Sequence, residues 1–111
     1  MTWDEVVAHA LTLPDAEATT YYGGPAVKAN GHPLITPGRE EGSFCLHIDQ
    51  DTKAILMETD PGTFWQTPHY DGWPSLLVRY DSPDPERVKD TIERSRDWVA
   101  AKPKPRPRKQ K

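Results

Sequence analysis

Polar and apolar residues follow a helical period at the start of this chain. Thr2 and Glu5 have the spacing of a capping box, and Pro14 stops the pattern that follows, so a helix is predicted over residues 2–12. Its apolar residues are expected to face the core on one side of the helix: Trp3, Val7, Ala10 and Leu11.

The pattern then changes to short strand-like runs. Asn30-Gly31 separates Ala26–Ala29 from Pro33–Thr36, and Asn-Gly between two such runs is a strong signal for a β-hairpin. A third strand is predicted over 43–48, where the residues alternate. Its core-facing residues are expected to be Phe44, Leu46 and Ile48.

A middle helix and two further strands are predicted next. Asp49 is a suitable N-cap, and the helix should end before Asp60-Pro61. Strands are expected over Phe64–Thr67 and Ser75–Tyr80, the second of them central because its middle is continuously apolar. The turn between them, rich in proline and glycine, is expected to display His69, Tyr70 and Trp73.

A last helix begins at Pro85, with Asp84 as its N-cap. Its buried stripe is expected to consist of Val88, Ile92, Ser95 and Val99. Residues 101–111 alternate proline with basic residues, so we expect a disordered tail there.

These elements predict one α+β domain over residues 1–100. The expected order is α-β-β-β-α-β-β-α, with an antiparallel sheet of about five strands and N-terminal, middle and C-terminal helices, because strands joined by short turns pair antiparallel. A chain of 111 residues is large enough for one such core. We expect a monomer, since a proline such as Pro33 disfavours pairing at a sheet edge.

Charge divides the chain into an acidic body and a basic tail. The formal net charge is −3, but the last eleven residues carry six of the fourteen Lys and Arg and no acid. The body therefore has eight basic against seventeen acidic residues, a balance of −9. The tail should attract a phosphate backbone, and the body should repel one.

Neither a cofactor nor a catalytic site is indicated. Cys45, the single cysteine, cannot form an internal disulfide, and no apolar run is long enough for a signal peptide or membrane span, so we expect a cytoplasmic protein.

Cys45 and His47 should share a strand face, but zinc sites use four ligands, and no metal or other cofactor is expected. Ser43 and Ser75 lack a nucleophile motif, so we expect no enzyme and no catalytic residues.

Several short motifs, in order from about residue 3 to residue 100, resemble the MmcQ/YjbR family of small bacterial proteins. They are Leu13-Pro14, Tyr22–Lys28, Asp60-Pro61, Phe64, Thr67–Pro74 and Leu77–Arg79. The resemblance implies a fold like that of the bacterial frataxin homologue, the CyaY-like fold. It also implies DNA binding and carries no enzymatic reaction.

Nucleic-acid contacts, weak and without sequence specificity, are therefore expected from the turn, from nearby cations and from the tail. Aromatic rings in the turn would stack on bases, and the cations would contact phosphates. The expected residues are Lys28, Thr67, His69, Tyr70, Trp73, Arg79, Lys102, Lys104, Arg106, Arg108, Lys109 and Lys111.

Three other interpretations of the turn stay open. Its aromatic residues would also serve to fill the rim of the core, a purely structural role. They would equally suit a protein partner docking on the turn. The third alternative is a small molecule bound between this turn and the segment Tyr21–Gly24.

Overall fold

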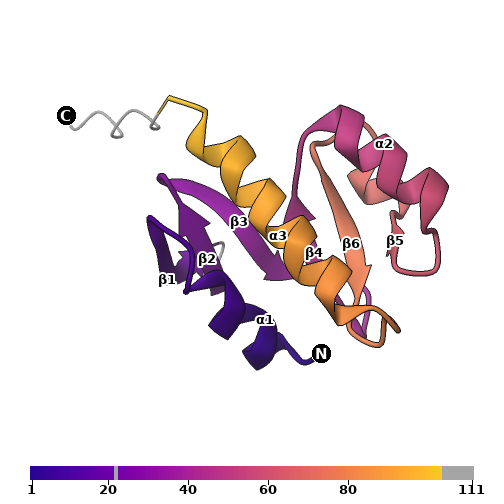
Figure 1. Cartoon of the computed structure of the whole chain (residues 1–111), viewed down its shortest axis with the longest axis horizontal. Coiled ribbons are helices and arrows are strands. Elements are labelled where there is room, and N and C mark those ends of the chain that lie inside the picture. The colour runs from indigo at the N-terminus through magenta and orange to yellow at the C-terminus, as the bar shows by residue number, and fades with distance from the viewer. Residues whose placement is uncertain (22, 104–111) are drawn as a thin grey trace.

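A computed structural model of the chain describes residues 1–21 and 23–103 (Figure 1). The helices are α1 (Trp3–Ala10), α2 (Gln50–Thr59) and α3 (Pro85–Ala100), with a 3-10 turn η1 (Pro68–Tyr70). The strands are β1 (Ala16–Tyr21), β2 (Gly24–Ala29), β3 (His32–Pro37), β4 (Ser43–His47), β5 (Phe64–Trp65) and β6 (Ser75–Arg79). The part of the expected tail beyond residue 103 lies outside the described residues.

The strands form one antiparallel sheet in the order β1-β2-β3-β4-β6-β5. The predicted α+β class is confirmed, with six strands where about five were expected. The additional strand is β1, which pairs with β2 from Ala16 opposite Ala29 to Tyr21 opposite Gly24. Its Ala-Glu-Ala start has weak strand preference, so pairing with β2 decides its conformation.

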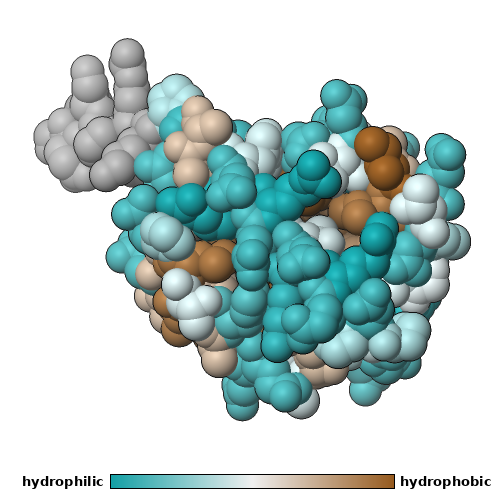
Figure 2. Space-filling view, in the orientation of Figure 1, coloured by the Kyte–Doolittle hydropathy of each residue, from teal (hydrophilic) through white to brown (hydrophobic). Residues whose placement is uncertain are grey.

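Helices α1 and α3 lie across one face of the sheet, and α2 lies at the end occupied by β5 and β6 (Figure 1). This side of the molecule is largely hydrophilic over α3, with hydrophobic surface gathered over α2 (Figure 2). The core beneath includes the following residues: Val6, Ala10, Phe44, Leu46, Ile48, Leu76, Val78, Val88, Ile92 and Val99. The core residues predicted for β4 and the stripe predicted for α3 are confirmed.

The predicted core face of α1 is wrong in part. The capping box is present, because the Thr2 hydroxyl accepts from the Glu5 N–H at 3.2 Å and the Glu5 carboxylate accepts from the Thr2 N–H at 2.8 Å. However, Val6 and Ala10 are the buried residues of the helix. Leu11, the C-cap, is 41% exposed, whereas Trp3 and Val7 are partly buried against the core.

The predicted Asn-Gly hairpin joins β2 to β3 and also holds the end of α3. Asn30 and Gly31 have φ angles of 53° and 77°, the left-handed conformations that a tight hairpin turn needs. The Asn30 side-chain amide donates to the carbonyls of Val99 at 3.0 Å and Lys102 at 2.8 Å. Residues 101–103 belong to the predicted tail, but the bond to Lys102 places them next to this hairpin.

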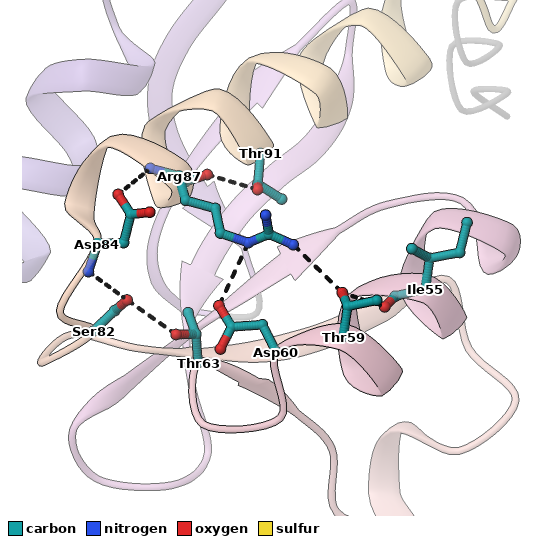
Figure 3. Close-up of polar contacts among 8 residues, drawn as sticks. All are labelled: Ile55, Thr59, Asp60, Thr63, Ser82, Asp84, Arg87 and Thr91. Atoms are coloured by element: carbon teal, nitrogen blue, oxygen red, sulfur yellow. Dashed lines mark hydrogen bonds and ion pairs between the residues drawn. The ribbon is translucent and has the colours of Figure 1, made fainter.

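A group of polar contacts fixes the start of α3 against the end of α2 (Figure 3). Arg87 lies with its Nε 3.4 Å from a carboxylate oxygen of Asp60, and its guanidinium also donates to the Thr59 hydroxyl at 3.5 Å. The hydroxyls of Ser82 and Thr63 are 3.0 Å apart. Asp84 and Asp49 cap α3 and α2 as predicted. These contacts hold the loop between α2 and β5 against the start of α3.

Candidate ligand-binding pocket

An open pocket of about 670 Å³ lies between the turn η1 and the β1–β2 hairpin. Because side chains alternate along β4, Cys45 and His47 project from the face opposite to the one that α1 and α3 cover. The lining residues are Tyr21, Gly24, Pro33, Thr36, Pro37, Arg39, Cys45, His47, His69, Tyr70, Trp73, Pro74 and Ser75. The pocket thus joins the two segments that the small-molecule interpretation had placed around it.

The floor of the pocket comes from three neighbouring strands. Thr36 of β3 lies opposite Cys45 of β4, and His47 of β4 lies opposite Ser75 of β6. The Cys45 Sγ lies 4.0 Å from the Nε2 of His47, and Thr36 and Ser75 flank this pair on the neighbouring strands. Strand pairing therefore assembles a small polar cluster from residues far apart in the sequence.

The floor is uncharged at neutral pH. Burial raises the pKa of the Cys45 thiol. Burial, together with the charge of Lys102, lowers the pKa of His47 to about 4. A reactive thiolate requires a cysteine with a lowered pKa or a cationic neighbour. Here the pKa of Cys45 is raised, and the lowered pKa of His47 leaves its imidazole neutral. The floor consequently offers neutral donors and acceptors to a ligand.

The turn η1 forms one wall. Pro68 lacks an N–H and begins the 3-10 turn, so β5 ends at Trp65 and not at Thr67 as predicted. The expectation that the turn displays Tyr70 is wrong, because Tyr70 is only 6% exposed and packs with Cys45 and Leu77. Trp73 is displayed as expected, with 65% of its surface exposed.

Lys53 of α2 holds this wall from behind. Its side chain is buried, with 3% exposed, and its Nζ donates to the carbonyls of Tyr70 at 2.8 Å and Trp73 at 2.7 Å. The Gln50 amide adds a bond to the Gly72 carbonyl at 2.8 Å. Burial lowers the pKa of Lys53. The pocket wall is therefore anchored to a helix and is not a free loop.

The residues predicted for nucleic-acid contact do not all line the pocket. His69, Tyr70 and Trp73 meet in the pocket, and Thr67 precedes the turn as its N-cap. The cations do not line the pocket: the Arg79 guanidinium lies 4.0 Å from the Trp65 ring centre, the Lys102 Nζ lies 3.9 Å from that of Trp98, and Lys28 lies opposite Glu17. The five remaining candidates lie outside the described residues: Lys104, Arg106, Arg108, Lys109 and Lys111.

Sequence reasoning missed Arg39, Thr36 and Lys53 as parts of the site. The alternation of 43–48 did place Cys45 and His47 on one face, which is the floor of the pocket. Nothing local to Lys53 distinguishes it from a solvent-exposed lysine on an amphipathic helix. Its partners are backbone carbonyls 17 and 20 residues later, and only the folded chain brings them together.

Two further observations concern the described residues alone. Within residues 1–21 and 23–103, no three His, Cys, Asp or Glu side chains are grouped closely enough to hold a metal ion. Within the same ranges, no helix combines the length and apolar character needed to cross a membrane.

Three mycobacterial proteins are similar to this chain over almost its whole length. They are uncharacterized protein Mb2600 of Mycobacterium bovis and uncharacterized proteins MT2646 and Rv2570 of Mycobacterium tuberculosis. Each is 32% identical to the chain, over 93% of this chain and 90% of the relative. The chain belongs to the family of these mycobacterial proteins. No family model matches it.

Proposed function

We propose that the protein binds a small molecule in the pocket between η1 and the β1–β2 hairpin. The lining of the pocket carries this proposal, and its volume of about 670 Å³ lies within the range of roughly 300–1,000 Å³ typical of small-molecule sites. Its lining also has the usual composition of such sites. Rings and prolines predominate, and a few polar groups converge on them.

The shifted pKa values support the same location. Three groups with raised or lowered pKa values, Cys45, His47 and Tyr70, line the pocket, and Lys53 lies directly behind its wall. Such groups gather at binding sites because a partly buried concave surface removes them from water. The neutral floor is suited to binding more than to nucleophilic catalysis.

A pocket-filling variant tests the proposal. Thr36→Trp places a large ring in the floor, and Thr12→Trp places the same ring at an exposed position after α1. A diverse compound set is screened against the wild type by thermal shift, and hits are measured by calorimetry. We expect saturable binding that Thr36→Trp abolishes and Thr12→Trp retains. The proposal fails if no compound binds, or if Thr36→Trp binds as the wild type does.

Nucleic-acid binding is a second candidate, supported by the exposed Trp73 ring at the pocket rim and by the resemblance to the MmcQ/YjbR family. An exposed ring of this kind is suited to stacking on an unpaired base. The test is binding of single-stranded and duplex DNA to the full chain and to a chain ending at Ala101, over a salt series. We expect Trp73→Ala to weaken single-strand binding and the truncation to reduce its salt dependence. Absence of binding near physiological salt would eliminate this candidate.

A further inference from the structure

We propose that the ligand of this pocket is a planar aromatic molecule that carries a negative charge. This inference rests on the proposed function and adds the chemical class of the ligand. It follows from three properties of the lining: its rings, its charge and its hydrogen-bond donors.

Aromatic rings surround the pocket on two sides. Tyr21 comes from the hairpin, and His69, Tyr70 and Trp73 come from the turn. The rings of His69 and Tyr70 already meet edge to face, with centres 4.9 Å apart and planes at 89°. Aromatic pairs favour such edge contacts and offset stacking, so a planar ring gains more here than an aliphatic group of equal size.

Charge around the pocket is opposite to the charge of the body. Arg39 is the charged residue among the described lining residues, and none of them is Asp or Glu. Glu40 and Asp71 do not line the pocket, although the Glu40 carboxylate is near enough to Tyr70 to contribute to its raised pKa. In a body with seventeen acids, Arg39 is thus the residue of the lining that is suited to an anion, since a guanidinium pairs with carboxylates or phosphates through two parallel hydrogen bonds.

The neutral polar groups also suit an anion. The Tyr70 hydroxyl accepts the backbone N–H of Arg39 at 3.4 Å, and its own O–H is a donor. Burial raises the pKa of Tyr70, so the phenol stays protonated at neutral pH. The Lys53 ammonium behind the wall adds a second positive charge close to the site, with the Asp71 carboxylate near it. A cationic ligand would meet these charges with no carboxylate among the described lining residues to balance its own.

Four probes of similar size test the ligand class: 2-naphthoate, 2-naphthamide, 2-naphthylmethylamine and the aliphatic acid decahydro-2-naphthoate. Calorimetry or NMR titration of the full chain gives their dissociation constants. We expect 2-naphthoate to bind about tenfold more tightly than each of the others, since a hydrogen bond to a charged group is worth more than a neutral one. Arg39→Met should remove the preference for the acid over the amide. Arg94→Met, the same loss of charge on exposed α3, should keep it.

Failure of the inference is distinguishable from failure of the proposed function. If the amide, the amine or the aliphatic acid binds best and Thr36→Trp abolishes that binding, the pocket is a ligand site but the ligand class is wrong. If Arg39→Met and Arg94→Met lower naphthoate affinity equally, the preference comes from overall charge and the inference is also overturned. If neither the four probes nor the diverse set binds, both proposals fail.

Discussion

The Nζ of Lys53 lies 2.7 Å from the carbonyl oxygen of Trp73, and this contact joins α2 to the wall of the pocket. Both carbonyls that accept from Lys53 have a second donor: the Trp73 N–H for Tyr70 at 3.0 Å, and the Ser75 N–H for Trp73 at 2.8 Å. Removing the ammonium would therefore leave neither carbonyl without a partner.

Lys53→Met should consequently cost little stability, about 1–2 kcal/mol, because methionine fills most of the buried volume and no longer requires a buried charge. Lys53→Ala leaves a cavity as well and should cost about 2–4 kcal/mol. Urea denaturation of the two variants measures the difference. An equal cost for both would mean that the hydrogen bonds, and not the packing of the chain, determine the contribution of Lys53.

His47 should make stability depend on pH. Its pKa is lowered from 6.5 to about 4 in the folded chain, so between these values the unfolded chain binds more protons. Stability is then fully present above pH 6.5 and falls as the pH decreases toward 4, by about 3 kcal/mol in total. His47→Gln should lose this part of the dependence.

The measurement is the free energy of unfolding at several pH values for wild type and His47→Gln. Titration of the carboxylates affects both chains alike and cancels in the difference. A difference that is constant from pH 7 to pH 4 would contradict the lowered pKa.

The thiol of Cys45 should react slowly in the folded protein. It is buried, and burial raises its pKa, so little thiolate is present at neutral pH. We expect alkylation by iodoacetamide at pH 8 to be roughly a hundredfold slower than in the denatured chain. Mass spectrometry over time gives both rates from the same sample, and equal rates would mean that the floor of the pocket is open to reagents.

Asn30 combines a backbone requirement with two side-chain bonds, and two substitutions separate them. Asn30→Gly keeps the left-handed turn but loses the bonds to Val99 and Lys102, which should cost about 1–2 kcal/mol. Asn30→Ala also strains the backbone and should cost about 1 kcal/mol more. Chemical denaturation measures both. If the glycine variant is as stable as the wild type, the amide contributes nothing to holding the end of α3.

Local signals in the sequence were sufficient for most of the fold. The capping box at Thr2, the caps at Asp49 and Asp84, and the Asn30-Gly31 turn each depend on residues within three positions of one another. They could be predicted because the contacts that stabilise them are local.

The errors concern contacts between distant segments. Tyr70 was expected at the surface, since nothing near it in sequence shows that Cys45 and Leu77 will cover its ring. Strand β1 was missed because its stability comes from pairing with β2. The pocket could be predicted only as a space between the turn and the segment Tyr21–Gly24. Arg39 and Lys53 could not be assigned to it, because only the folded chain brings them there.

Strand β4 has a further consequence for how this family tolerates change. Phe44 and Leu46 lie in the core, whereas Cys45 and His47 line the pocket. Neighbouring residues of this strand are thus constrained differently: Phe44 and Leu46 by packing in the core, and Cys45 and His47 by their place in the pocket lining. In a saturation mutagenesis of residues 44–47, abundance in the cell should drop most at Phe44 and Leu46, less at Cys45, which packs with Tyr70 and Leu77, and least at His47.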